Sequence, residues 1–406
     1  MCKVKRVIFI FPTIFNKRDY HRFGFEIIQK RGYEVEAWDF SSWWRPKYAS
    51  NYSVPDPINF GGHKILRTKN EIVKSISTLS VNDIVIDPWG IINDNLFIKK
   101  ILYNNGIIYG GFLGGFIPSK KKLPNYESGI KKGYETHTSL QKKLYLLAKK
   151  TISILLNPLL NSTKEVTVKP SHSFIIICGG DKGNQLINDF ANKPTKIIKT
   201  HALDYDRYLE EENSNNHDTN LKDNYALFLD EDVPSHPDYL YHNIKPYCDS
   251  EKYYSEINRF FIWFEQKSVM PVIIAAHPRA DYKKRDNPFD GRKIVIDNTI
   301  NYVKHAKIIF AHMSTSKNFA ILYNKPIVYI DSDNYPTVFR EHIWGHSSIL
   351  GESPINVSND LDSLTINDKI DRELYKSYKE TYIKELGTPE KPVWDIFCDY
   401  LDKMNA

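Results

Sequence analysis

Short apolar runs alternate along the N-terminal part of the chain with segments whose apolar residues recur at helical spacing. The runs are rich in β-branched residues and end in polar residues, which is typical of strands buried on both faces of a sheet. These runs are Val7–Phe11, Val35–Phe40, Asp83–Asp87 and Gly106–Gly110. The segments with helical spacing are Tyr20–Arg31, Val73–Leu79 and Asp94–Asn104. Strands that alternate with helices of about ten residues predict a parallel α/β sheet.

A second alternation of the same kind follows residue 172. Its apolar runs are Phe174–Cys178, Lys196–His201, Tyr225–Leu229, Val272–Ala276, Lys307–Ala311 and Lys325–Ile330. Helical spacing marks Tyr253–Gln266, Asp368–Leu386 and Pro392–Lys403. The pattern predicts two Rossmann-like halves, residues 1–170 and 171–375, followed by C-terminal helices over residues 376–406. No GxGxxG motif follows the first run, which argues against a dinucleotide bound there.

Residues 117–160 interrupt the alternation and are rich in lysine. Between residues 140 and 156 the apolar residues fall on one face of a predicted helix, and lysines gather on another face. These lysines are Lys142, Lys143, Lys149 and Lys150. A basic amphipathic helix lies on an anionic membrane surface, whereas an ordinary core helix exposes its lysines to solvent. The sequence leaves both interpretations open, and the first implies peripheral contact with a membrane.

The composition fits a globular protein of two domains. The chain has 406 residues, 41% hydrophobic and 26% charged, with a net charge of +6. This mild excess of positive charge suits binding of anionic small molecules or of a lipid surface, and it does not predict nucleic-acid binding. The four cysteines are scattered, which indicates reduced thiols in a cytoplasmic protein. No apolar run approaches the ~20 residues that span a bilayer, and the first run is too short for a signal peptide.

Three polar clusters follow predicted strands of the second half. They are Asp230-Glu231-Asp232, His277-Pro278-Arg279 and Ser314-Thr315-Ser316. In an open parallel sheet, ligands bind beyond the carboxyl ends of the strands, so we expect the clusters at one crevice. Imidazole, guanidinium, hydroxyl and backbone N–H groups together suit a phosphate. Three adjacent carboxylates are costly to bury, which favours a site near solvent where one of them acts as a base.

Other polar residues follow other predicted strands. His201 with Asp204 fits a metal or acceptor-sugar site, or simple helix capping. Gly179-Gly180 fits a tight turn, and lining of the cleft is the alternative. His236-Pro237 lies shortly after the acidic cluster and is expected to start the next helix. No spacing of His, Cys and carboxylates marks a metal cage, so no metal is expected.

In their order along the chain, the three clusters resemble the motifs of bacterial sialyltransferases and related nonulosonate transferases. Those enzymes carry a D/E-D/E-G motif, an HP motif and a serine-rich motif, matched here by Asp230-Glu231, His277-Pro278 and Ser314–Ser316. The match covers roughly residues 225–330, and Asp232 replaces the glycine of the acidic motif. The resemblance implies a GT-B fold: two Rossmann-like domains facing across a cleft, with C-terminal helices crossing back. It implies an acceptor site mainly on residues 1–170 and a donor site on residues 171–375.

The resemblance also implies a reaction. A nonulosonic acid of the sialic, pseudaminic, legionaminic or Kdo type would move from a CMP-activated donor to a bacterial surface glycan such as capsule, O-antigen or lipooligosaccharide. The transfer would invert the anomeric centre and need no metal or other cofactor. Asp230 would take the proton of the acceptor hydroxyl, with Asp232 or Glu231 as the alternative base.

The remaining motif residues are expected at the donor. His277 would protonate or hydrogen-bond the leaving phosphate, and Pro278 would fix the turn that presents it. Arg279 would meet the donor's carboxylate or brace the loop. Hydroxyl and backbone N–H groups would hold the phosphate, and they belong to Ser314, Thr315 and Ser316.

Two other functions fit the same residues. A GT-B glycosyltransferase that uses a UDP- or GDP-sugar would hold its diphosphate with basic residues, a pair that Arg279 and Lys317 would supply. A non-catalytic protein on this scaffold would bind carbohydrate or nucleotide without turnover. For the transferase, the expected partners are a CMP-sugar and a glycan or glycolipid acceptor, without nucleic acid. The expected location is the cytoplasm, free or on the cytoplasmic face of the inner membrane.

Overall fold

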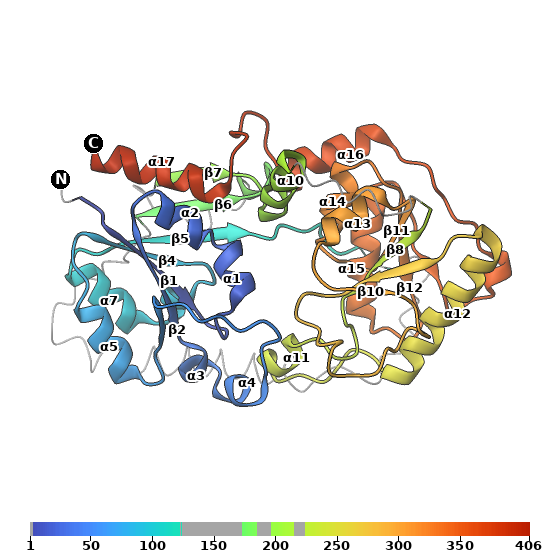
Figure 1. Cartoon of the computed structure of the whole chain (residues 1–406), viewed down its shortest axis with the longest axis horizontal. Helices are drawn as coiled ribbons and strands as arrows, with labels where there is room; N and C mark the ends of the chain where they lie inside the picture. The colour runs from blue at the N-terminus through green and yellow to red at the C-terminus, as the bar shows by residue number, and fades with distance from the viewer. Residues whose placement is uncertain (1–2, 122, 124–172, 185–195, 215–223) are drawn as a thin grey trace, which may run out of the picture. The chain divides into compact units, whose positions relative to one another are not determined.

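The computed structural model describes residues 3–121, 123, 173–184, 196–214 and 224–406 (Figure 1). Residues 1–122 and 171–406 belong to one compact unit. The lysine-rich helix predicted over residues 140–156, with Lys142, Lys143, Lys149 and Lys150, lies outside the described residues. Within the described ranges, no helix is long and apolar enough to cross a membrane.

Seven described strands form a parallel sheet, called here the N-terminal sheet, in the order β3-β2-β1-β4-β5-β6-β7. Its strands are β1 (Arg6–Phe11), β2 (Glu34–Asp39), β3 (His63–Ile65), β4 (Asp83–Asp87), β5 (Ile108–Gly114), β6 (Phe174–Cys178) and β7 (Lys196–Thr200). The helices between them are α1 (Lys17–Arg22), α2 (Phe25–Lys30), α3 (Ser41–Trp44), α4 (Pro46–Asn51), α5 (Lys69–Ser77), α6 (Ile91–Asp94) and α7 (Leu96–Asn104). Strand β4 is buried along its whole length, as expected for a strand covered on both faces.

Strands β6 and β7 belong to the N-terminal sheet, and not to the second half (171–375) in which the sequence pattern placed them. The order of strands continues from β5 through β6 to β7, and all of them are parallel. Phe174 of β6 pairs with Gly110 of β5, where a Cβ atom would lie 2.1 Å from the Phe174 ring. An apolar run predicts a strand but not its neighbour, because pairing depends on such contacts between distant residues.

Six described strands form a second parallel sheet, called here the C-terminal sheet, in the order β10-β9-β8-β11-β12-β13. Its strands are β8 (Ala226–Leu229), β9 (Val272–Ala275), β10 (Ile294–Val295), β11 (Ile308–Ala311), β12 (Ile327–Asp331) and β13 (Ile355–Asn356). The helices that follow β7 along the chain are α10 (Leu203–Asn213), α11 (Asp238–His242), α12 (Ser250–Ser268), α13 (Thr299–His305), α14 (Lys317–Leu322), α15 (Thr337–Ser348), the 3₁₀ turn η1 (Leu361–Ser363), α16 (Arg372–Tyr378), the π-helical turn η2 (Lys379–Ile383) and the final helix α17 (Val393–Asn405). Because β9, β8 and β11 are neighbours, the three polar clusters leave adjacent strand ends, as the sequence predicted.

The final helix α17 packs on the N-terminal sheet, although its sequence follows the C-terminal sheet (Figure 1). Trp394 is buried against Phe9 of β1, with ring centroids 5.1 Å apart. The same ring lies against Gly24, whose left-handed conformation (φ 59°) separates α1 from α2. The single helix predicted over Tyr20–Arg31 is therefore wrong. Two parallel α/β halves with a C-terminal helix crossing back form the GT-B arrangement that the sequence predicted.

Candidate active site

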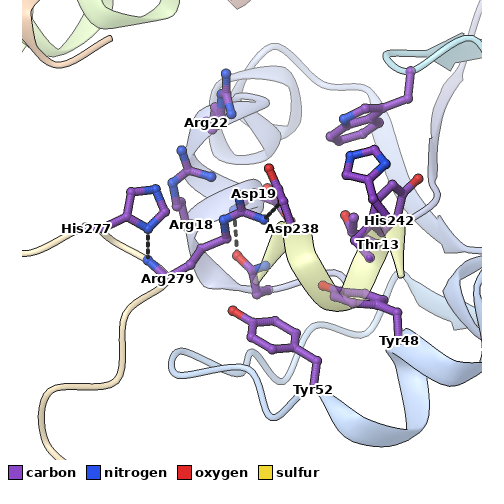
Figure 2. A pocket seen from close by; sticks show the side chains of 13 residues that line it. Thr13, Arg18, Asp19, Arg22, Tyr48, Tyr52, Asp238, His242, His277 and Arg279 are labelled. Atoms are coloured by element: carbon purple, nitrogen blue, oxygen red, sulfur yellow. Dashed lines mark hydrogen bonds and ion pairs between the residues drawn. The ribbon is translucent and has the colours of Figure 1, made fainter. Parts of the chain in front are cut away.

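A cavity of about 330 Å³ is lined by helices and loops that follow strands of both sheets (Figure 2). Its walls contain three guanidinium groups, two carboxylates, histidines and aromatic rings. From the N-terminal half come Thr13, Asn16, Arg18, Asp19, Arg22, Tyr48, Tyr52 and Trp89. From the second half come Asp238, Tyr241, His242, His277 and Arg279. Such a charged and aromatic lining suits an anionic carbohydrate or nucleotide ligand.

Helix α1 brings two arginines and an aspartate to this cavity. Asn16 caps the helix, because its side-chain oxygen accepts a hydrogen bond from the Asp19 N–H at 3.0 Å. Arg18 and Arg22 lie four positions apart, so they lie on one side of the helix. Figure 2 shows both guanidinium groups in the neighbourhood of the Asp19 carboxylate. These residues were not among the candidates predicted from the sequence, although they form a charged run shortly after the first predicted strand.

Asp19 has the electrostatics of a general base. Asp19 is only 5% exposed, and this burial raises the pKa of its carboxyl group to about 6. The positive charges of Arg18, Arg22 and Arg279 act in the opposite direction and lower this pKa. Its carboxylate has no ion-pair partner within 4.0 Å among the described residues. A carboxylate with a pKa near the working pH is well suited to accept a proton from a hydroxyl group.

His277 projects from the end of β9 as a neutral imidazole. The Arg279 N–H donates a hydrogen bond to His277 Nδ1 at 3.3 Å, so the ring proton lies on Nε2. Burial lowers the pKa of His277 well below its usual range, and the neighbouring His236 and Arg279 lower it further. The ring centroids of His236 and His277 are 4.7 Å apart. His277 is thus arranged to donate a hydrogen bond from Nε2 to a ligand in the cavity.

Arg279 is held by residues between the end of β8 and the first turn of α11. Its Nη1 lies 2.9 Å from Asp238 Oδ1, and its Nη2 lies 3.3 Å from His236 Nε2 (Figure 2). We expected His236-Pro237 to start a helix, and α11 begins at Asp238 with Pro237 as its N-cap residue. The sequence did not show that this turn also positions the guanidinium of Arg279.

The side chains of the acidic cluster, residues 230–232, make contacts with three different segments of the C-terminal half. Asp230 is 3% exposed, and its Oδ2 accepts hydrogen bonds from the Tyr282 hydroxyl at 2.6 Å and from the His277 N–H at 3.5 Å. Asp232 pairs with Arg285 at 2.6 Å, and both line a second cavity of about 200 Å³. Glu231 accepts from the Met313 N–H at 3.2 Å, and burial raises the pKa of Glu231 to about 8.

None of these three carboxylates lines the larger cavity. Asp230 is placed to support the backbone of His277, while Asp232 faces the smaller cavity. The role of Asp230, Glu231 or Asp232 as the base stays a prediction.

The serine cluster connects β11 to α14 without lining either cavity. The Ser316 N–H donates to Ser314 Oγ at 3.3 Å, and Thr315 is exposed. Lys317 follows as a fully buried residue whose Nζ lies 2.9 Å from His346 Nδ1. Burial lowers the pKa of Lys317 to about 7. Lys317 therefore forms no basic pair with Arg279 in the larger cavity. Phosphate binding by residues 314–316 stays a prediction.

The predicted cleft residues of the β6 and β7 ends make packing contacts outside both cavities. A Cβ atom at Gly180 would lie 2.1 Å from the Glu380 carbonyl oxygen, and one at Gly179 would lie 2.5 Å from the Phe116 ring. His201 Nε2 lies 2.9 Å from the Lys391 carbonyl oxygen. Asp204 accepts a hydrogen bond from Asn318 Nδ2 at 2.8 Å, which joins α10 to α14.

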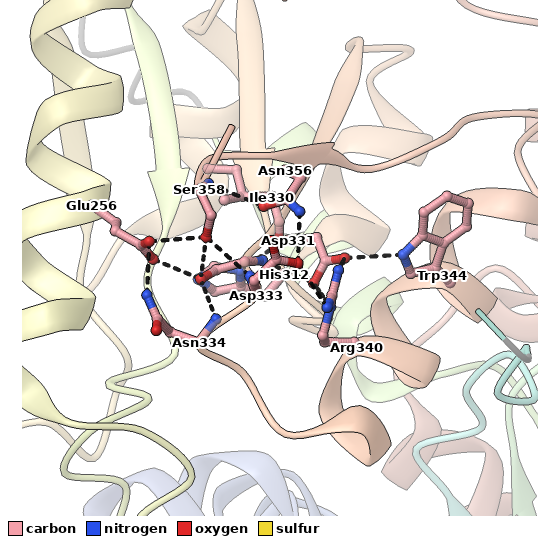
Figure 3. Close-up of polar contacts among 11 residues, drawn as sticks. Glu256, His312, Ile330, Asp331, Asp333, Asn334, Arg340, Trp344, Asn356 and Ser358 are labelled. Atoms are coloured by element: carbon pink, nitrogen blue, oxygen red, sulfur yellow. Dashed lines mark hydrogen bonds and ion pairs between the residues drawn. The ribbon is translucent and has the colours of Figure 1, made fainter. Parts of the chain in front are cut away.

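A closed polar network stabilises the end of β12 (Figure 3). Asp331 accepts from Arg340 at 3.0 Å and from Trp344 Nε1 at 3.0 Å, which fixes α15. Glu256 accepts from the hydroxyls of Ser332 and Ser358 at 2.6 and 2.9 Å. The polar groups of this network satisfy one another, so its role is structural.

No group of three His, Cys, Asp or Glu side chains in the described part of the chain is arranged to hold a metal ion. The expected independence from metal stays a prediction.

No protein-family model matches the chain, and no curated protein matches it. Solved structures similar to it include a UDP-GlcNAc 2-epimerase from Methanocaldococcus jannaschii, with 12% identity, a TM-score of 0.45, and coverage of 97% of this chain and 99% of that chain. UGT89C1 from Arabidopsis thaliana shows 10% identity, a TM-score of 0.45 and full coverage of both chains. UGT2 from Phytolacca americana, complexed with UDP-2fluoro-glucose and pterostilbene, shows 8% identity, a TM-score of 0.48, and coverage of 99% and 100%.

Proposed function

We propose that this protein is an inverting glycosyltransferase that moves a sugar from a nucleotide-activated donor to a hydroxyl group of an acceptor. The observation that carries the proposal is one cavity in which Asp19, a carboxylate without an ion pair among the described residues, faces His277 and Arg279. The first group comes from the N-terminal half, and the other two come from the end of β9. A base and a set of hydrogen-bond donors in one cavity are what a displacement at an anomeric carbon needs.

In this mechanism Asp19 accepts the proton of the acceptor hydroxyl as the hydroxyl oxygen attacks the anomeric carbon. The bond between the anomeric carbon and the phosphate oxygen of the donor breaks, and negative charge develops on that oxygen. His277 donates a hydrogen bond from Nε2 to the leaving phosphate, and Arg279, held by Asp238, adds positive charge nearby. Because attack and departure occur on opposite faces, the anomeric configuration inverts.

We assign the base to Asp19 in preference to Asp230. The Asp230 carboxylate already accepts hydrogen bonds from Tyr282, Asp232 and His277, and it lines neither described cavity. Asp19 lines the cavity, and its raised pKa suits proton transfer near neutral pH. Asp230 then acts as a positioning residue for the His277 loop.

The donor that this cavity favours is a nucleoside diphosphate sugar. A diphosphate leaving group carries more negative charge than a single phosphate and recruits cations. The lining of the cavity contains Arg279 together with His277, whereas the serine cluster that would suit CMP lies outside it. A CMP-activated nonulosonic acid is the second candidate, because the acidic, HP and serine motifs leave neighbouring strands β8, β9 and β11 in the expected order.

A thermal-shift titration with CMP, CDP, UDP and GDP in the presence of EDTA tests the donor class. A ligand that binds only the folded state raises the melting temperature. Stabilisation by UDP or GDP supports the diphosphate donor, and selective stabilisation by CMP supports the nonulosonate donor. No response to any nucleotide would refute a nucleotide-sugar donor. Nucleotide binding without turnover of any donor sugar would indicate a non-catalytic binding protein.

A further inference from the structure

Arg18 and Arg22 are the two guanidinium groups of the cavity that form no direct ion pair among the described residues. Within the described residues neither has an ion-pair partner within 4.0 Å, whereas Arg279 lies 2.9 Å from Asp238. Arg18 is half-buried, and burial lowers the pKa of Arg18 to about 10, helped by the nearby charge of Arg22. Holding two guanidinium groups close together in a partly buried site costs free energy, which a bound anion offsets.

We infer that Arg18 and Arg22 form a subsite for a carboxylate or phosphate carried by the acceptor, so that the acceptor is an acidic glycan. This inference rests on the proposed transferase function and names its substrate class. Guanidinium groups are well suited to either anion, because their N–H groups form paired, charge-assisted hydrogen bonds with two oxygens.

The position of Asp19 assigns this anion to the acceptor and not to the donor. Asp19 is adjacent to Arg18 in sequence and lies within one turn of Arg22 on α1. An acidic sugar bound by the two arginines would therefore present a nearby hydroxyl to the base. The leaving phosphate of the donor is instead expected at His277 and Arg279, which come from the other half of the chain.

Aromatic side chains of the same cavity provide surfaces for a sugar ring. Trp89 is 43% exposed and lines the cavity, while its ring packs against Phe11 with centroids 5.2 Å apart. Tyr52 also lines the cavity, and its ring stacks on the buried ring of Tyr48 at 5.1 Å with an angle of 22° between their planes. Amphipathic rings of this kind combine an apolar face with a polar edge, which suits the two sides of a sugar.

An anion bound here also changes the base. The positive charges of Arg18 and Arg22 oppose the rise in the pKa of Asp19. An anion that neutralises them would let this pKa rise, because the carboxylate loses favourable charge partners. With an acidic acceptor, the acidic limb of the pH profile of kcat, which reports the bound enzyme, should therefore lie at higher pH than that of kcat/KM.

The test uses the full-length protein with two charged sugars and one neutral sugar. Dissociation constants are measured by saturation-transfer NMR for glucuronate, glucose 6-phosphate and glucose. The wild type should bind at least one charged sugar about tenfold or more tightly than glucose, the effect expected of a charge-assisted hydrogen bond. Arg18→Gln combined with Arg22→Gln should reduce this preference to about one.

Two further variants separate the subsite from general charge and from misfolding. Lys17→Gln removes a charge from an exposed residue of α1 that does not line the cavity, and it should keep the preference. Arg22→Gln alters an exposed residue, so it should fold normally and lose part of the preference.

Nucleotide titrations of the same variants separate this inference from the proposed function. UDP, GDP or CMP should stabilise the double variant as much as the wild type. Equal binding of charged and neutral sugars by the wild type would overturn the acidic-acceptor subsite. An equal loss of nucleotide and sugar affinity in the double variant would also overturn it, because the arginines would then serve the donor. A preference for charged sugars without any nucleotide binding would leave the subsite standing and refute the transferase.

Discussion

Replacing Asp19 by asparagine separates catalysis from stability at one buried position. The substitution keeps the size of the side chain but removes the group that we assign as the base. General bases contribute about 10²- to 10⁴-fold to a rate, so kcat/KM should fall by about that factor. In the wild type, a pKa of about 6 leaves about a tenth of Asp19 ionised at pH 5 and about nine-tenths at pH 7. The wild-type kcat/KM should therefore rise about tenfold over this range, and the asparagine variant should lose that dependence.

The same substitution should stabilise the fold at neutral pH. Burial raises the pKa of Asp19 from 3.8 to about 6, so the folded state binds the proton more tightly than the unfolded state between these values. Stability therefore falls as pH rises through this window, and the ionised carboxylate costs about 3 kcal/mol above it. Asp19→Asn removes that cost, so its melting temperature should exceed that of the wild type at pH 7.5 but not at pH 4.

The assay uses activated sugars of the nucleotide that the thermal-shift titration identifies, and it follows release of that nucleotide from pH 5 to pH 8. Asp56→Asn, at an exposed residue of the same half, is the matched control and should leave the profile unchanged. Asp230→Asn tests the alternative base. Retention of wild-type kcat/KM by Asp19→Asn, together with loss of the acidic limb in Asp230→Asn, would refute our assignment.

Three further outcomes follow from named contacts. His277→Gln should lower kcat by about 10²- to 10³-fold with little change in nucleotide affinity, because the leaving phosphate loses a hydrogen-bond donor. A change in nucleotide affinity alone would contradict that role. Trp394→Ala should lower the free energy of unfolding by about 3–5 kcal/mol, measured by urea denaturation, because it opens a cavity between α17 and the N-terminal sheet. A cost under about 1 kcal/mol would mean that Trp394 does not hold α17 on this sheet. Gly110→Ala should lower the melting temperature more than Gly61→Ala. An added Cβ would meet the Phe174 ring at position 110 and no atom within 4 Å at position 61. Equal melting temperatures of the two variants would argue against the pairing of β5 with β6.

Much of the chain's secondary structure and part of the candidate site follow from the sequence. The strands Asp83–Asp87 and Phe174–Cys178 end where the apolar pattern predicts. His277 follows β9 and lines the larger cavity, as expected for a polar residue at the carboxyl end of a parallel strand. These features depend on residues close together in the chain, so the local pattern contains the information that determines them.

Other features appear only in the tertiary structure. Helices α1 and α2 are separated at Gly24, which lies against the ring of Trp394 from the far end of the chain. Strand β6 pairs with β5 of the N-terminal sheet, where Phe174 lies opposite Gly110. Asp19 becomes a candidate base only when folding buries it among three arginines that come from α1 and from the end of β9.

The sequence by itself thus determined the alternation of strands and helices and the chemistry at the strand ends. Tertiary structure decided which strands share a sheet and which charged groups share a cavity. The physical reason is that hydrophobic periodicity reflects contacts within a few residues, whereas burial, ion pairing and pKa depend on side chains brought together from distant positions.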